Sequence, residues 1–99
     1  MTVETNTTHE AESKLWLGKF NMTSNASSKI AMEDVLIALK RHHAGDWGDV
    51  CPADRDANEW AVKNGERLFS VYHDPYGVKF WIITERDRSI TTVLMPEDY

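Results

Sequence analysis

The sequence has a single cysteine, Cys51, so it lacks the cysteine pairs from which disulfide frameworks and cysteine-rich metal sites are built. It also lacks long hydrophobic runs, and its first 12 residues contain neither a basic stretch nor an apolar one. We therefore expect no signal peptide and no membrane-spanning helix. The expected location of such a chain is the reducing cytoplasm.

Positive charge is scarce. The 11 Lys and Arg residues stand against 16 Asp and Glu residues, which gives a net charge of −5. This balance disfavours non-specific attraction to nucleic acid or to anionic lipid, because both carry negative phosphates. With 99 residues, of which 41% are hydrophobic, the chain can build one compact core. We expect a single α+β domain over residues 15–99, preceded by a disordered polar tail over residues 1–14.

Residues 29–65 have the periodicity of two helices. The first is expected to take its N-cap from residues 25–28 and to end near His43. The second is expected to run from Pro52 to a left-handed cap at Gly65. Two apolar stripes on the first helix predict that it is deeply buried against a sheet. The stripes are Ala31, Val35, Ala38, Leu39 and His42, and Met32, Leu36, Leu39 and His43.

The last third of the chain, residues 66–99, has strand patterns at 67–73, 78–85 and 90–95. Their connections are too short for crossovers, which predicts an antiparallel meander. The segment before the two helices, residues 15–28, is expected to be a linker and a hydrophobic arm that forms a short strand or packs on the rest of the domain. The predicted fold is therefore α+β, with two helices packed on a three- or four-stranded antiparallel meander.

The central strand of this meander is apolar on both faces. One face carries Phe80 and Ile82, and the other carries Trp81 and Ile83. Helices are expected to cover one face. The Trp81 face is then either covered by the arm, residues 15–22, or offered to a partner.

The loop from Gly45 to Asp49 combines two glycines, which permit positive φ, with two carboxylates and a tryptophan. One interpretation is structural, with Trp47 filling a gap between the helices. The other is that the loop contacts a partner together with residues of the meander. The candidate binding residues are Asp46, Trp47, Asp49, Trp81, Arg86 and Thr91.

A second set of residues has the chemistry of a metal-independent ribonuclease. Such enzymes need one group that takes the 2′-hydroxyl proton, another that protonates the leaving oxygen, and a guanidinium that stabilises the phosphorane. The candidate catalytic residues are His42, His43, Arg67, Glu85 and Arg88. The simpler interpretation is a helix-capping histidine pair and a charged turn. Because adjacent helical residues point about 100° apart and no Cys/His cluster accompanies the two histidines, we expect no metal and no cofactor.

Three sequence blocks carry a resemblance to a known family. They are Gly45-Asp-Trp-Gly48, then Trp81-Ile-Ile-Thr-Glu85 continuing through Asp87-Arg-Ser89 to Thr91-Thr92, and finally Leu94-x-Pro96-Glu97-x-Tyr99. From about Val35 onward the chain resembles short bacterial proteins of plasmids, phages and integrative elements, usually labelled plasmid-related proteins. The order of helices followed by a meander is also similar to ribonucleases of the barnase, EndoU, colicin and RelE type.

These resemblances lead to two functional hypotheses. The first is a mobile-element protein that docks on a host macromolecule and inhibits a bacterial defence system of the CRISPR or restriction kind. The second is a toxin-type ribonuclease, against which the acidic charge counts. A protein partner is expected, with nucleic acid reached through that partner or as a substrate. A homodimer is expected if the Trp81 face is uncovered or if an edge strand at 67–73 or 90–95 is open.

Overall fold

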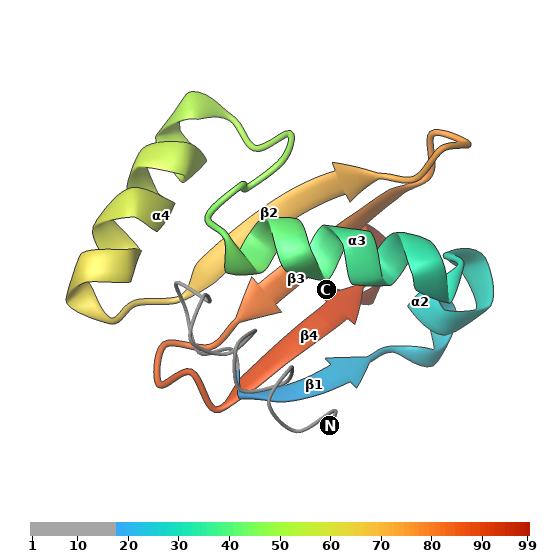
Figure 1. Ribbon diagram of the computed structural model, residues 1–99, viewed down its shortest axis with the longest axis horizontal. Helices are drawn as coiled ribbons and strands as arrows, with labels where there is room; N and C mark the ends of the chain where they lie inside the picture. The colour runs from blue at the N-terminus through green and yellow to red at the C-terminus, as the bar shows by residue number, and fades with distance from the viewer. Residues whose placement is uncertain (1–17) are drawn as a thin grey trace, which may run out of the picture.

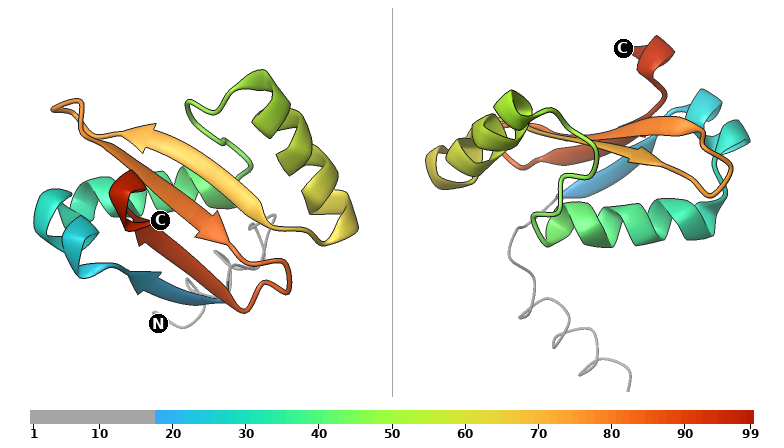
Figure 2. Two further views of the ribbon diagram at one scale, coloured as in Figure 1. Left: turned by 180° about the vertical axis from the view of Figure 1, so that it is seen from behind. Right: turned by 90° about the horizontal axis from the view of Figure 1, so that it is seen from above.

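The computed structural model describes residues 18–99, and the tail expected over residues 1–14 lies outside them. The elements in chain order are β1 (Lys19–Met22), α2 (Ser24–Lys29), α3 (Met32–His43), α4 (Pro52–Asn64), β2 (Leu68–His73), β3 (Lys79–Thr84), β4 (Ile90–Leu94) and the 3-10 helix η1 (Pro96–Asp98). The strands form one sheet in the order β1-β4-β3-β2. Figures 1 and 2 show α3 across one face of this sheet, η1 on the other face and α4 beside the β2 edge. The α+β class is confirmed.

The predicted meander is confirmed in its order and direction. β2 pairs with β3, and β3 pairs with β4, both antiparallel. The β2–β3 turn is held by Asp74, whose Oδ1 accepts hydrogen bonds from the backbone N–H of Tyr76 at 2.9 Å and of Val78 at 2.8 Å. Gly77 completes this turn with a φ of +85°, a conformation that favours glycine.

The fourth strand corrects the expectation of a wholly antiparallel sheet. β1 pairs with β4 in parallel, with Lys19 opposite Ile90 and Met22 opposite Val93. The short turns of the meander force their strands to be antiparallel, whereas the long path from β1 to β4 imposes no direction. β1 therefore extends the edge of the sheet and does not cover the Trp81 face.

The helix expected to end near His43 is two helices. Thr23 caps α2, and its Oγ1 accepts a hydrogen bond from the N–H of Ala26 at 3.1 Å. Ile30 and Ala31 then adopt extended backbone conformations, and α3 begins at Met32. Ile30 is buried in the main core, so packing fixes a break that helix propensity alone does not indicate.

Of the two apolar stripes of α3, only one is deeply buried. Val35, Ala38 and His42 face the sheet and are buried. On the second stripe, Met32 and Leu36 remain half exposed. The expected deep burial of both stripes is therefore wrong, because a sheet on one side of α3 covers only one side of the helix.

The predicted second helix, α4, is confirmed. It runs from Pro52 to Asn64 and is capped by Gly65, which adopts the left-handed conformation with a φ of 71°. None of the helices described within residues 18–99 is long and apolar enough to cross a membrane.

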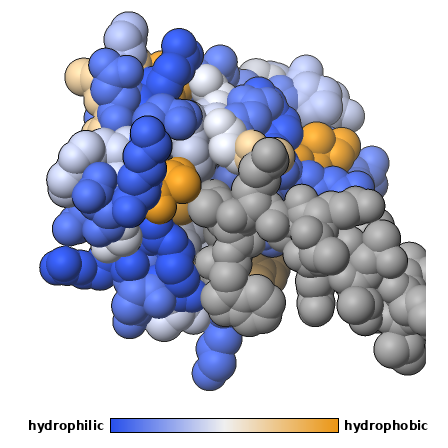
Figure 3. Space-filling view, turned by 60° about the vertical axis from the view of Figure 1, so that its left-hand side comes forward, coloured by the Kyte–Doolittle hydropathy of each residue, from blue (hydrophilic) through white to orange (hydrophobic). Residues whose placement is uncertain are grey.

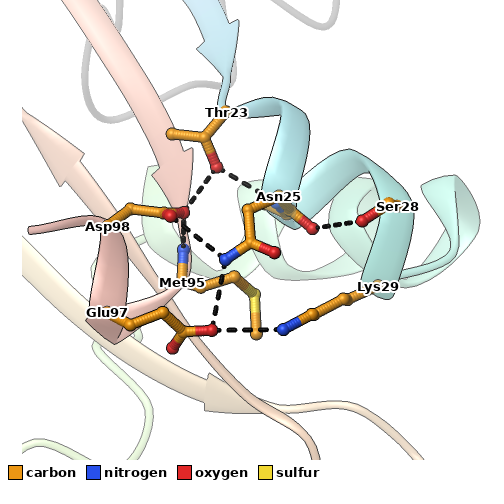
Figure 4. Close-up of polar contacts among 8 residues, drawn as sticks. Thr23, Asn25, Ser28, Lys29, Met95, Glu97 and Asp98 are labelled. Carbon is orange, nitrogen blue, oxygen red and sulfur yellow. Dashed lines mark hydrogen bonds and ion pairs between the residues drawn. The ribbon is translucent and has the colours of Figure 1, made fainter.

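The C-terminus is fixed to the start of α2 by a group of polar contacts (Figure 4). One carboxylate oxygen of Asp98 accepts hydrogen bonds from Thr23 Oγ1 at 2.7 Å and from the Met95 N–H at 2.9 Å. Asn25 Nδ2 donates to both Asp98 and Glu97 at 3.1 Å. We call Thr23, Asn25, Glu97 and Asp98 the C-terminal clasp. It holds η1, and with it Tyr99, on the face of the sheet opposite α3 (Figure 2).

Candidate functional site

The outer edge of β2 is closed by side chains and a loop. The Asn58 amide of α4 donates to the carbonyl of Phe69 at 2.6 Å and accepts from the N–H of the same residue at 3.1 Å. Further along the strand, the N–H of Val71 donates to the carbonyl of Trp47 at 3.1 Å, and the N–H of Asp49 donates to the carbonyl of Val71 at 2.7 Å. β4 is paired on both sides. Neither of the edges considered for a homodimer is therefore open.

The contact with the edge of β2 explains the residue types in the Gly45–Asp49 loop. Gly48 has a φ of +73°, and a Cβ at this position would stand 2.0 Å from the carbonyl oxygen of Val71. Trp47 is buried between α3 and α4, where its indole N–H donates to Glu59 at 2.8 Å. Trp47 was a candidate for partner contact, but its side chain is inside the protein.

Asp46 belongs to this loop and lies on the surface. Its carboxylate accepts hydrogen bonds from Arg41 at 2.7 Å and 3.3 Å. The Arg41 guanidinium holds the pKa of Asp46 below its usual value. Asp49 is also exposed and pairs with His73 at 2.8 Å.

His42 is fully buried between α3 and the sheet. Its Nδ1 lies 2.6 Å from Ser70 Oγ and its Nε2 lies 2.9 Å from Thr84 Oγ1, which is 2.8 Å from Thr91 Oγ1. Burial lowers the pKa of His42 to about 4, so the ring is neutral at pH 7, one nitrogen donating and the other accepting. The network satisfies a polar core position. Thr91, expected at a binding surface, is buried within it.

His43 lies apart from the buried network of His42. It lines a groove of about 450 Å³ between α3 and β1, which we call the α3 groove. The groove is lined by Gly18, Phe20, Leu36, Ile37, Leu39, Lys40, His43 and Thr91. The Nε2 atom of His43 is buried and has no hydrogen-bond partner among the described residues.

Arg88 has a structural role. It has a φ of 62°, and its guanidinium donates to the carbonyls of Ala61 at 3.1 Å, Glu66 at 2.6 Å and Glu85 at 3.2 Å. These contacts fasten the end of α4 to the β3–β4 turn. Arg86 is exposed in the same turn, and its guanidinium lies 3.5 Å from the Glu66 carboxylate.

Arg67 lies on the face of the sheet opposite His42. It lines a second groove, of about 290 Å³, formed by α4, the sheet and the C-terminus. We call this the sheet-face groove. Its lining residues are Asp54, Ala57, Asn58, Arg67, Phe69, Trp81, Ile83 and Tyr99.

Three aromatic rings follow one another across the sheet-face groove. The ring centroids of Phe69 and Trp81 are 5.0 Å apart, and those of Trp81 and Tyr99 are 5.7 Å apart, both in edge-to-face geometry. The Arg67 guanidinium carbon lies 5.2 Å from the centre of the Tyr99 ring, within cation–π range. Tyr99 is 71% exposed, so the end of this series is open to a partner.

The sequence indicates Trp81 and Arg67 as candidates, but not that they belong to one site. Phe69, Asp54 and Tyr99 line the same groove and were not among the candidates. For Phe69 a signal exists, because the alternation of the hairpin puts it on the Trp81 face. No local pattern predicts that Tyr99 reaches this face.

The described residues hold no cluster of three or more His, Cys, Asp or Glu side chains that could bind a metal ion. Comparison of the chain with protein-family models, with curated proteins and with solved structures finds no match. The geometry of the two grooves is therefore the basis for assigning a function.

Proposed function

We propose that this chain is a binding protein that docks on a protein partner through the sheet-face groove. The observation that carries this proposal is the series of Phe69, Trp81 and Tyr99, with Arg67 against its exposed end. Aromatic and arginine side chains dominate the energetic centres of protein interfaces, because they bury large areas with few torsional degrees of freedom.

The rigidity of the groove supports the same proposal. Phe69 is fixed through both of its backbone polar groups by Asn58, and Tyr99 is held by the C-terminal clasp. A surface whose contact residues are already ordered loses less conformational entropy when a partner binds.

The charge of the groove favours protein over nucleic acid. Arg67 and Asp54 are its two charged lining residues, and they have opposite signs. A nucleic-acid surface normally gathers several cations along the phosphate path, and the whole chain carries −5.

The positions of the candidate catalytic residues count against the ribonuclease alternative. His42 is buried on one side of the sheet and Arg67 lies on the other. The Arg88 guanidinium is occupied by backbone carbonyls. A histidine and an arginine that act on one phosphate must both reach it, and His42 and Arg67 do not.

The resemblance to proteins of mobile elements directs the choice of partner. We propose that the partner is a host macromolecular complex, and that a CRISPR or restriction complex is the first class to test. Inhibition of such a complex requires only that the sheet-face groove occupy a surface the complex needs.

Matched surface variants test this function. The wild-type chain, the double variant Arg67→Glu/Tyr99→Ala and the control Tyr76→Ala are used to capture partners from host cells, and the Kd of the purified partner is then measured. Tyr76 is a suitable control because it is 88% exposed and lies in the β2–β3 turn, outside the groove lining. We expect the double variant to lose at least about tenfold in affinity and Tyr76→Ala to bind normally.

Equal binding by all three chains contradicts the assignment of the sheet-face groove. The purified wild-type chain and the variant His43→Ala are also incubated with RNA. Cleavage that is lost in His43→Ala would contradict the binding function itself and support the ribonuclease alternative.

A further inference from the structure

The α3 groove lies on the other side of the sheet and is lined mainly by apolar residues. Leu36 and Ile37 of α3 are 52% and 58% exposed, and Phe20 of β1 is 47% exposed beside them. Together they line about 450 Å³ of groove. The visible surface in Figure 3 is mostly hydrophilic, with small hydrophobic patches between polar side chains. An apolar groove of this size is a place where another segment packs.

Gly18 is the point at which the N-terminal part of the chain reaches this groove. It lines the groove and has a φ of +66°. A Cβ on Gly18 would lie 2.2 Å from the carbonyl oxygen of Arg88, so only glycine fits where the chain crosses the β3–β4 turn. The described part of the chain therefore begins at the rim of the groove.

The residues before Gly18 have the composition that such a groove accepts. Leu15-Trp16-Leu17 is the only run of consecutive apolar residues in positions 1–17. Before it stand Glu10 and Glu12, at most about 17 Å of extended chain from residue 15. With Lys14, these two carboxylates give residues 10–15 a net charge of −1, and the groove is lined by Lys40, whose charge is opposite.

His43 supplies a separate observation. The residue lines the same groove, and its Nε2 atom is buried and lacks a partner among the described residues. A buried nitrogen normally has a hydrogen-bond partner, and a carboxylate or backbone carbonyl of an adjacent segment can provide one.

We propose that the segment Leu15–Leu17 folds back over the α3 groove of its own chain, with Trp16 as the anchor. The segment covers the apolar stripe of α3, and the acidic residues before it lie toward Lys40 and His43. The surface is separate from the sheet-face groove and does not depend on the function proposed for it.

Paramagnetic broadening in NMR spectra tests this contact. In the full chain carrying Cys51→Ser, a nitroxide is attached through Ser13→Cys, and methyl signals of Leu36 and Ile37 are recorded. We expect these signals to lose most of their intensity, while methyl signals of Val62 on the exposed side of α4 keep theirs. With Trp16→Ser added, the loss should become clearly smaller, and with Val3→Ser added as the control it should be unchanged.

A mixed sample separates docking within one chain from docking between chains. Isotope-labelled chain without nitroxide is combined with unlabelled, nitroxide-bearing chain. Undiminished signals in this mixture are the expected result. Broadening of Leu36 and Ile37 in the mixture would mean that a second copy fills the groove and would overturn the proposal, as would full intensity of these signals in the singly labelled chain.

Discussion

The side-chain amide of Asn58 makes the two hydrogen bonds to Phe69 that a neighbouring strand would otherwise make. A helix thereby closes the edge of the sheet and also fixes the strand that carries one wall of the sheet-face groove. Open strand edges invite pairing with other chains, and this contact removes that possibility at the centre of β2.

Asn58→Ala is expected to destabilise the protein by about 2–3 kcal/mol, because the N–H and C=O of Phe69 lose their partners. The free energy of unfolding is measured by urea denaturation. Asn64→Ala is the control on the same helix, since Asn64 is exposed and donates only to the carbonyl of Trp60. Its cost should stay below about 0.5 kcal/mol. Equal costs for the two variants would show that the edge contact contributes nothing special.

Replacement of Gly48 tests why the Gly45–Asp49 loop has its sequence. Gly48→Ala places a Cβ into the backbone of Val71 and should cost about 3 kcal/mol or more. Gly77→Ala is the matched control, because Gly77 also has a positive φ but has no atom within 4 Å of its Cβ position. About 1 kcal/mol is expected there, from backbone strain alone. A Gly48→Ala chain as stable as Gly77→Ala would contradict the tight approach of the loop to β2.

Because of His42, the protein should become less stable as the pH is lowered. Its pKa is about 4 in the folded protein against an ordinary value of 6.5, so between these values the unfolded chain binds a proton that the folded chain does not. The stability is fully present above pH 6.5 and declines as the pH falls toward 4, by roughly 3 kcal/mol in total. Lowered pKa values of Asp46 and Asp98 add their own losses at lower pH.

The variant His42→Gln tests whether His42 causes this pH dependence. Gln keeps hydrogen-bonding groups but cannot titrate, so the slope of unfolding free energy between pH 6.5 and 4.5 should flatten. An unchanged slope would assign the pH dependence to other groups.

The C-terminal clasp should control access to the end of the chain. Asp98→Ala removes the acceptor of Thr23 and of the Met95 N–H, so η1 should detach and carboxypeptidase should release Tyr99 faster. Asp87→Ala is the control, because Asp87 is an exposed acid in the β3–β4 turn, at the opposite end of β4 from η1. Equal release from both variants and the wild type would mean that the clasp does not hold the C-terminus.

Local chemistry explains which parts of this structure were predictable. The strands of the meander follow from alternation and from turns such as Asp74–Gly77, and α4 follows from Pro52 and Gly65 at its ends. The break at Ile30 and the parallel pairing of β1 depend on packing between distant segments, which no local pattern encodes.

The candidate site shows the same division. Trp81 was identifiable as a residue on a distinct face of the central strand. Its association with Arg67 and Tyr99 depends on the C-terminal clasp, which joins residues more than 70 positions apart. His42 and Trp47 have functional chemistry in sequence, but burial assigns them to the core.

The most direct test of the sheet-face groove is crosslinking from its exposed end. A photoreactive p-benzoylphenylalanine replaces Tyr99 in one chain and Tyr76 in another, and both are irradiated in host cells. We predict a single discrete protein adduct from position 99 that is absent from position 76 and is lost when Arg67→Glu is added. An adduct from position 76 alone, or one from position 99 that Arg67→Glu leaves unchanged, would contradict the assignment of this groove as the binding surface.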